Sequence, residues 1–236
     1  VRAIAPDDSD HIVEIGPGEG ALTQALISGE CRLDAIELDR DLRTRLLAAF
    51  STYSGFTLHS DDALDFDFAS LVTDGTRLRV VGNLPYNIST PLIFKLLEQA
   101  PIITDMHFML QLEVVQRLAA SPGSKDWGRL GVMAQFRCEV ESLFEVPPEA
   151  FYPPPKVHSA VVRLTPHLTP AYPNVDPTSL ARVVTQAFSQ RRKTLRNNFK
   201  GTMEDNDFEG LAINPSARAE TLSIEDFVAI ATHLHG

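Results

Sequence analysis

The stretch "HIVEIGPGEGALTQALI", residues 11–27, predicts how the chain begins to fold. Its first five residues are mostly apolar and predict a short buried strand. Three glycines then predict a tight loop, and "ALTQALI" has the apolar spacing of a helix. A strand that passes through a glycine loop into a helix is typical of a parallel α/β sheet.

The same alternation of strand and helix continues as far as residue 120. Further strands are predicted over residues 32–39, 56–63, 77–86 and 105–111. Further helices are predicted over residues 40–50, 90–99 and 112–120. The helix over 90–99 is expected to have Thr90 as its N-cap and Pro91 at its first position. This order predicts a mostly parallel, doubly wound sheet.

The pattern changes after residue 121. "GRLGVMAQFRCEV" (128–140) and "KVHSAVVRL" (156–164) are interpreted as two strands without an intervening helix, an antiparallel pair that closes the sheet. A Pro/Thr-rich stretch follows, and beyond it helices are expected over 178–188, 190–199 and 224–234. We therefore predict an α/β domain over 1–166 and a small all-helical domain over 167–236.

Composition limits the class of protein. The 236 residues are 44% hydrophobic and 22% charged, as in a soluble globular protein, and no apolar run has membrane-spanning length. Cys31 and Cys138 lack metal or redox spacing, and the seven histidines show no ligand pattern. We expect a cytoplasmic protein without metal. The net charge of −10 argues against a generally polyanion-binding surface.

Marked residues stand where the parallel strands are predicted to end, the edge at which such sheets bind ligands. The first is the glycine loop, with G-x-G-x-G spacing at Gly16, Gly18 and Gly20, preceded by Glu14 and containing Glu19. Two carboxylates would repel a pyrophosphate, so the loop favours a ligand with a cationic or neutral middle. The glycines alone are equally compatible with a tight turn.

Two acids follow the next strands. Glu37 is suited to accept both ribose hydroxyls of an adenosine, and Asp62 to accept from an adenine amino group. Each alone is equally compatible with a solvated surface acid.

"NLPY", residues 83–86, is the most specific of these strand ends. An aromatic amine such as adenine N6 is a poor nucleophile. The side-chain oxygen of Asn83 and the carbonyl of Leu84 can accept both of its hydrogens and orient its lone pair. Pro85 fixes the backbone, and Tyr86 can stack on the base.

A basic stretch lies in the predicted helical domain. Residues 177–203 contain six Arg or Lys and no Asp or Glu. A solvated helix surface explains this stretch by itself better than a nucleic-acid contact does.

The motifs together resemble one family. The matching stretches are "VEIGPGEGALT", "IELDRDL", "VGNLPYNISTPLIFKLL", "MHFMLQLEVVQRLAA", "GRLGVMAQF", "FYPPPKVHSAVVRL" and "QAFSQRRKTLRNNF". They cover nearly the whole chain and closely resemble the KsgA/RsmA family, small-subunit rRNA adenine N6,N6-dimethyltransferases that use S-adenosylmethionine. The resemblance implies a Rossmann-like methyltransferase sheet with a helical, rRNA-binding C-terminal domain.

The resemblance also implies roles for individual residues. Target-adenine contacts fall on Asn83, Leu84, Pro85 and Tyr86, with Phe151 of "FYPPP" as a second stacking wall. Cofactor contacts fall on Gly16, Gly18, Glu37, Leu38, Asp62, Ala63 and Asn83. The resemblance also replaces the solvated-surface interpretation of the basic stretch with one in which Arg191, Arg192, Lys193 and Arg196 face rRNA.

The chain departs from the family at a few positions. Leu112 stands where relatives often have Lys or Arg, His158 where they often have Asp, and Trp127 where Tyr is common. The family's "GQNFL"-type segment is absent ahead of Val1. By the resemblance, the natural protein is expected to carry roughly 20–40 further residues there, covering one side of the cofactor.

By the resemblance, we expect dimethylation of two adjacent adenines near the 3′ end of 16S rRNA in a pre-30S particle, by a monomer that yields S-adenosylhomocysteine. Two alternatives stay open: an Erm-type 23S rRNA methyltransferase, and a non-catalytic assembly or transcription factor on the same scaffold. A NAD-dependent dehydrogenase is disfavoured by the glycine spacing and by the lack of an obvious hydride-transfer acid/base pair.

Overall fold

The structure is a computed structural model that describes residues 1–73, 75–85, 87–152 and 154–235. The chain forms two compact units. The sheet unit comprises Val1–Val115 and Glu139–Pro166, and the helical unit comprises Gln116–Cys138 and the residues from His167 onward. The division into domains at residue 167 stays a prediction, and residues 116–138 group with the C-terminal helices.

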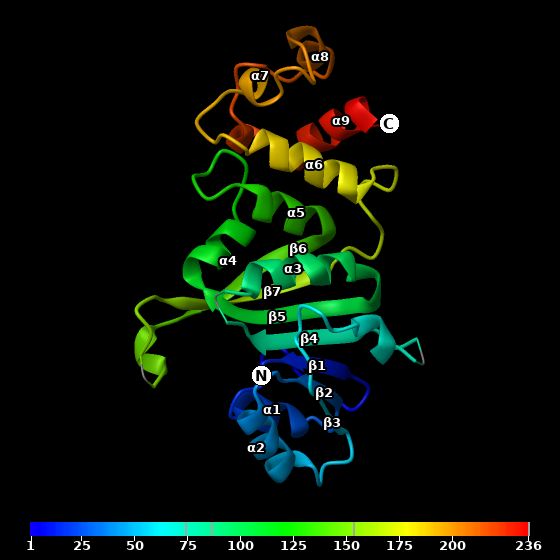
Figure 1. Cartoon of the computed structure of the whole chain (residues 1–236), viewed down its shortest axis with the longest axis vertical. Helices are drawn as coiled ribbons and strands as arrows, with labels where there is room; N and C mark the ends of the chain where they lie inside the picture. Colours follow the sequence, from blue (N-terminus) through cyan, green and yellow to red (C-terminus); the bar gives the residue numbers. More distant parts are fainter. Residues whose placement is uncertain (74, 86, 153, 236) are drawn as a thin grey trace. The chain divides into compact units, whose positions relative to one another are not determined.

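One seven-stranded sheet has the strand order β3-β2-β1-β4-β5-β7-β6, which can be followed in Figure 1. The strands β1 to β5 pair in parallel, and β7 pairs antiparallel to β5, so the predicted mostly parallel sheet with an antiparallel closing strand is confirmed. The strands are β1 His11–Ile15, β2 Arg32–Ile36, β3 Phe56–His59, β4 Leu78–Asn83, β5 Ile103–Gln111, β6 Cys138–Val146 and β7 Ser159–Pro166.

The central strands of the sheet end side by side at the edge where parallel sheets bind ligands. The strand β1 is buried along its whole length, as expected for a central parallel strand covered on both faces. Its last residue, Ile15, lies opposite Ile36 of β2 and Gly82 of β4. The residues that follow these three positions, Gly16, Glu37 and Asn83, therefore leave the sheet at the same edge.

Helices connect the parallel strands of the sheet unit and make up most of the helical unit. In the sheet unit, α2 begins after Asp39, whose side chain caps it by accepting from the N–H groups of Asp41 and Leu42. The helices are α1 Ala21–Ile27, α2 Arg40–Phe50, α3 Ser89–Glu98, α4 Leu112–Leu118, α5 Arg129–Arg137, α6 Pro177–Ala187, α7 Leu195–Asn198, α8 Asp205–Gly210 and α9 Ile224–His235.

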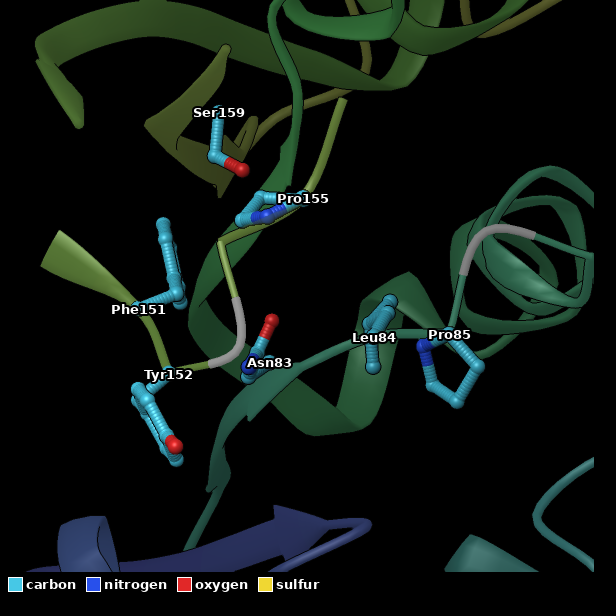
Figure 2. Close-up of a pocket in the computed structure, with 7 residues that line it drawn as sticks. All are labelled: Asn83, Leu84, Pro85, Phe151, Tyr152, Pro155 and Ser159. Carbon is cyan, nitrogen blue, oxygen red and sulfur yellow. The ribbon is translucent and has the colours of Figure 1, made fainter. Parts of the chain in front are cut away.

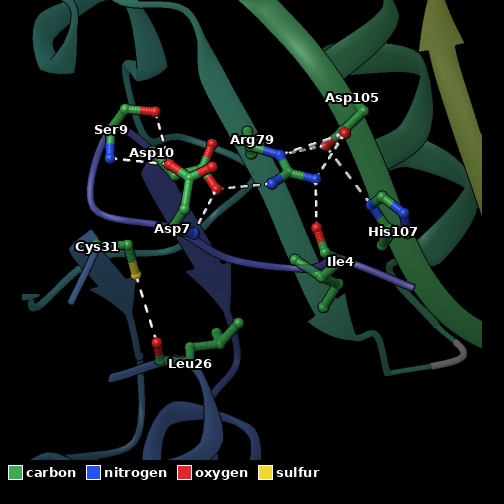
Figure 3. A network of polar contacts seen from close by, with 9 residues as sticks. All are labelled: Ile4, Asp7, Ser9, Asp10, Leu26, Cys31, Arg79, Asp105 and His107. Carbon is green, nitrogen blue, oxygen red and sulfur yellow. Dashed lines mark hydrogen bonds and ion pairs between the residues drawn. The ribbon is translucent and has the colours of Figure 1, made fainter. Parts of the chain in front are cut away.

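The residues ahead of β1 are held to the sheet by a partly buried arginine (Figure 3). Arg79 of β4 forms ion pairs with Asp10, at 2.7 Å, and with Asp105 of β5, at 2.9 Å. Its guanidinium also donates to the carbonyl of Ile4 at 2.7 Å. Burial raises the pKa of Asp105, but hydrogen bonds from His107 and Arg79 outweigh it and hold that pKa below its usual value. This network links the N-terminal segment to two strands.

The helical unit has its own core. Trp127 is buried, and its indole Nε1 donates to the carbonyl of Leu222 at 2.9 Å. The helices α6 and α9 pack together, and the Phe188 and Phe227 rings lie 5.8 Å apart. Phe199 and Phe208 form an edge-to-face pair with centroids 5.8 Å apart.

The strand predicted over 128–140 is wrong in most of its length. Residues 129–137 form the helix α5, and the strand β6 begins only at Cys138. Six of the nine helix residues are buried, so the segment is apolar on nearly every side. Such a run has neither a helical nor a strand period to read, and a buried helix looks like a buried strand.

Two helix boundaries also differ from the predictions. The helix α3 begins at Ser89, with Ile88 as N-cap, so Thr90 is not the cap and Pro91 is its third residue. The Ser89 N–H already donates to the carbonyl of Pro85, which starts the helical turn earlier.

The helix expected over 190–199 is limited to Leu195–Asn198. The Leu195 N–H donates to the carbonyl of Ala217 and the Arg196 N–H to that of Pro215. These distant partners replace the carbonyls four residues back that a longer helix would use.

Candidate active site

The glycine loop leaves an open backbone surface beside β1. Gly16, Gly18 and Gly20 all have left-handed backbone angles, with φ of 64°, 59° and 83°. A Cβ added to Gly16 or Gly18 would meet no atom within 4 Å, whereas one on Gly20 would lie 2.6 Å from the ring of Phe50. Gly20 is therefore required for packing as well as for its turn, and the other two leave room for a ligand.

Glu37 joins the end of β2 to this loop. Its side chain is buried to 8% exposure and accepts from the Gly18 N–H at 3.2 Å and from the Asp39 N–H at 2.9 Å. One carboxylate oxygen takes each bond, and each oxygen keeps further acceptor capacity. The structure thus brings together Gly18 and Glu37, two predicted cofactor residues. Their neighbour Leu38 is 65% exposed.

Beneath the loop lies a buried acid that the family resemblance did not assign. Glu14 of β1 is 1% exposed. Burial raises its pKa from 4.5 to about 7, and the nearby Glu37 adds to the rise, while the hydrogen bond from Thr23 opposes it.

Asp62 and Ala63 follow β3 in a tight turn. The Asp62 side chain accepts from the Leu64 N–H at 2.9 Å, and Ala63 is buried. No described contact joins Asp62 to Glu37 or to the glycine loop. Asp62 lies at the same edge of the sheet as Glu37 because β2 and β3, the strands that precede them, pair in parallel.

A histidine pair that was not predicted anchors the end of β3. Buried Asp34 of β2 interacts with His11 Nε2 at 2.7 Å and with His59 Nε2 at 2.6 Å. The His59 ring also packs edge-on against Phe66, with centroids 5.1 Å apart. Burial raises the pKa of Asp34, but the bonds from the two histidines outweigh it and keep that pKa low. Sequence analysis missed this group because its three residues come from three neighbouring strands, and a single sequence does not show which strands are neighbours.

A pocket of about 400 Å³ lies where β4 ends (Figure 2). Four residues predicted to meet the target base line it: Asn83, Leu84, Pro85 and Phe151. Phe151 comes from the segment between β6 and β7, so the fold brings together parts of the chain that are far apart in sequence. Tyr86, the fifth predicted residue, lies outside the described residues. Sequence reasoning missed Tyr152, Pro155 and Ser159, which line the same pocket.

The turn at this pocket is held by the neighbouring strand. Asn83 is exposed and lies opposite Met109 of β5, and the next N–H, that of Leu84, donates to the Met109 carbonyl at 3.3 Å. The Leu84 side chain is 1% exposed and anchors the turn in the core. Asn83 is therefore presented to solvent on a fixed backbone.

The four predicted RNA-facing cations divide into two pairs. Arg191 forms an ion pair with Glu220 at 3.1 Å and donates to the carbonyl of Lys125, and Arg196 pairs with Asp205 at 2.7 Å. Within the described ranges, the side chains of Arg192 and Lys193 form neither an ion pair nor a hydrogen bond. The carboxylates lie beyond residue 203, outside the stretch whose sequence is purely basic.

Two features are absent from the described part of the chain. No cluster of three or more His, Cys, Asp or Glu among those residues is arranged to hold a metal ion. None of the helices described there is long and apolar enough to cross a membrane.

The parallel sheet closed by an antiparallel strand, the open glycine loop, the acid after β2 and the Asn-Leu-Pro turn after β4 define a Rossmann-like methyltransferase. The chain belongs to the ribosomal RNA adenine dimethylase family, which matches residues 1–235. The family resemblance carried by the sequence motifs is confirmed.

Relatives and solved structures agree. The chain is 58% identical to "Ribosomal RNA small subunit methyltransferase A" of Pseudomonas aeruginosa over 99% of this chain and 87% of that protein. It is 57% identical to the protein of the same name from Saccharophagus degradans, with the same coverage. A dimethyladenosine transferase from Plasmodium falciparum superposes with a TM-score of 0.80 at 25% identity, covering 97% and 91% of the two chains. The 23S rRNA methyltransferase ErmE shares the fold, with a TM-score of 0.75 at 22% identity, covering 100% and 95%.

Proposed function

We propose that this protein dimethylates N6 of two adjacent adenines near the 3′ end of 16S rRNA within a pre-30S particle, with S-adenosylmethionine as methyl donor. The observation that carries the proposal is the pocket that joins Asn83 and Leu84 to Phe151 on a chain of the rRNA adenine dimethylase family. High identity to proteins named as small-subunit methyltransferases supports the choice of rRNA.

The residues at the sheet edge fit the proposed cofactor. Glu37 keeps acceptor capacity for two ribose hydroxyls, and the bare backbone at Gly16 and Gly18 leaves space for the methionine part. The exposed apolar side chain of Leu38 offers a surface for the adenine ring, with Asp62 and Ala63 at the ring's edge. Asn83 adjoins both this edge and the target-base pocket. When bound, the cofactor supplies an electrophilic sulfonium methyl.

The chain's own residues prepare the target amine. The Asn83 side-chain oxygen and the Leu84 carbonyl accept the two N6 hydrogens, and so direct the nitrogen lone pair away from the ring. The orientation of the Leu84 carbonyl is set in advance, because the Leu84 side chain is buried and its N–H is bonded to β5. Phe151 provides a stacking surface for an extruded adenine.

The Erm-type alternative is not favoured. ErmE shares the fold at 22% identity, which carries no statement about substrate, whereas relatives at 53–58% identity over 99% of the chain are named for the small subunit. A non-catalytic factor is disfavoured by the intact Asn83–Leu84–Pro85 turn in an open pocket.

Partners and location follow from the substrate. We place the rRNA contact on the helical unit, with the unpaired side chains of Arg192 and Lys193 as its first cations and with Arg191 and Arg196 available after exchange of their carboxylate partners. The protein would act as a monomer in the cytoplasm, where subunits are assembled.

Methyl transfer from labelled S-adenosylmethionine to unmethylated small subunits tests the function. The expected result is two dimethylated adjacent adenines near the 3′ end of 16S rRNA, mapped by primer extension. Unmethylated large subunits serve as the control. Label in 23S rRNA alone would support the Erm-type alternative, and cofactor binding without transfer to either RNA would support the non-catalytic one.

A further inference from the structure

A buried residue gives the pocket a hydroxyl that has no role in the proposed mechanism. Ser159, the first residue of β7, is 3% exposed and lines the pocket together with Asn83. Figure 2 shows its hydroxyl pointing toward the side of the pocket where Asn83 lies. Within the ranges that the structure describes, this hydroxyl forms no hydrogen bond.

The backbone around Ser159 is fixed. Ser159 lies opposite Gln111 in the antiparallel ladder between β7 and β5. The carbonyl of the preceding residue, His158, accepts from the Leu112 N–H at 2.9 Å, and the next residue, Ala160, is fully buried. A serine on such a backbone can adjust only by rotation about its Cα–Cβ bond and by rotation of its hydroxyl hydrogen.

The base also needs donors at its ring nitrogens, and the Asn83 side-chain NH2, placed beside the oxygen that accepts from the amino group, can serve only one of them. Adenine's amino group donates two hydrogens, which Asn83 and Leu84 are suited to accept, but the ring nitrogens N1 and N7 on either side only accept. Pro85 and Pro155 have no N–H, and the Leu84 N–H is already bonded to Met109. Tyr152 is fully exposed, so among the pocket residues described Ser159 is the buried residue that offers a side-chain hydroxyl.

We propose that the Ser159 hydroxyl donates a hydrogen bond to the ring nitrogen beside the target amino group, and so fixes the orientation of adenine for attack. The inference rests on the proposed function, since it names a further contact with the same base. A base held by two acceptors at its amino group still rotates in its plane about them. A donor at the neighbouring nitrogen removes that freedom, and it favours a ring that carries an acceptor there.

The first test compares Ser159→Ala, Ser159→Thr and Val161→Ala in methyl transfer to unmethylated small subunits. Val161 is the control because it lies on the same strand and the same face but does not line the pocket. Ser159→Ala should lower kcat/KM about 10-fold or more, the scale for a buried partner left without its hydrogen bond. Ser159→Thr, which keeps the hydroxyl, should retain most of the activity, and Val161→Ala should resemble the wild type. Affinity for S-adenosylhomocysteine and the melting temperature should be unchanged in Ser159→Ala.

The second test asks whether the hydroxyl meets a ring nitrogen. Subunits are reconstituted with 1-deazaadenosine or 7-deazaadenosine at the target position, each of which replaces one ring nitrogen by C–H. For one of the two analogues, the wild type should lose activity and Ser159→Ala should lose nothing further. An equal loss for Ser159→Ala on adenosine and on both analogues would overturn the inference, as would full activity of Ser159→Ala on adenosine. A wild-type protein that transfers no methyl group would overturn the proposed function itself, and with it this contact.

Discussion

Thr23 donates a 2.7 Å hydrogen bond from its Oγ1 to Oε2 of Glu14, and both residues are fully or almost fully buried. The bond links the first turn of α1 to β1 directly below the glycine loop. It does not compensate the burial of the acid, because the pKa of Glu14 is raised to about 7. The folded protein therefore holds a proton at Glu14 that the unfolded chain releases.

This pKa predicts a pH dependence of stability. Because the folded pKa is about 7 and the ordinary value is 4.5, the folded state binds more protons between these pH values. Stability should fall as pH rises through that window, by ~3 kcal/mol in total. Glu14→Gln keeps an acceptor for Thr23 without a charge, so it should remove this part of the pH dependence. Urea unfolding of both proteins at pH 5 and pH 8 measures it. The same difference between the two proteins at both pH values would contradict the prediction.

Asn83→Ala should abolish methyl transfer without unfolding the protein. Asn83 is exposed and contributes no core packing, but it supplies one of the two acceptors proposed for the reacting amine. The expected loss is ~10²-fold or more in kcat, the scale for one preorganised polar contact. Asn174→Ala, at an exposed loop position outside the pocket, is the matched control. Near-normal methyl transfer by Asn83→Ala would show that Asn83 is not an acceptor for the reacting amine.

The parallel half of the fold was predictable because short apolar runs bounded by turn residues alternate there with segments of helical hydrophobic spacing. The segment that becomes α5 was not, since it is apolar on nearly every side. The helix predicted over 190–199 is too long because the backbone N–H of Leu195 bonds to the carbonyl of Ala217, which no local pattern shows.

The candidate site also contains residues that the sequence predicts and residues that it does not. Gly16, Glu37 and Asn83 could be proposed from their positions at strand ends, because parallel strands align these ends. Phe151 came only from the family resemblance. Ser159, together with the His11–Asp34–His59 group, depends on which strands are neighbours, and one sequence does not reveal that order.

Glu37→Ala should weaken binding of S-adenosylhomocysteine by about 1–3 kcal/mol. The variant loses the proposed acceptor for the ribose, and it also frees the Gly18 N–H that Glu37 now binds. Calorimetry measures the affinity. Asp39→Ala is the control: it removes a carboxylate two residues away that caps α2, so it should cost about 1 kcal/mol of stability and leave cofactor affinity intact. Unchanged affinity in Glu37→Ala would show that this acid does not meet the ribose.

The basic residues of the helical unit should not contribute equally to subunit binding. Arg192→Ala with Lys193→Ala should weaken binding and lower its salt slope by about 0.7–0.9 for each phosphate that is no longer neutralised. Arg191→Ala should lower the slope less, because Arg191 is already paired with Glu220, and it should also lower the melting temperature slightly. Binding measured from low to moderate salt distinguishes them. If the double variant kept the wild-type salt slope, the basic stretch would be a solvated surface and not an rRNA contact.

Gly82→Ala should disturb the candidate active site by forcing β4 away from β1. Gly82 lies directly before Asn83 and opposite Ile15, and a Cβ there would be 2.6 Å from the Ile15 carbonyl oxygen. The strand β1 has little freedom to move away, because it pairs with β2 on one side and with β4 on the other. Forcing the two backbones apart should cost about 1–3 kcal/mol, as overpacking of a core does.

Displacement of β4 in Gly82→Ala should also lower the rate of methyl transfer. A shift of β4 moves Asn83 relative to the base, and small misplacements of positioning groups lower rates steeply. We therefore expect Gly82→Ala to lower both the melting temperature and kcat. Gly210→Ala is the matched control, because a Cβ at the end of α8 meets no atom within 4 Å and Ala favours a helix. It should leave both quantities near the wild-type values. If Gly82→Ala were as stable and as active as Gly210→Ala, the close approach of β1 and β4 would not be what holds Asn83 in place.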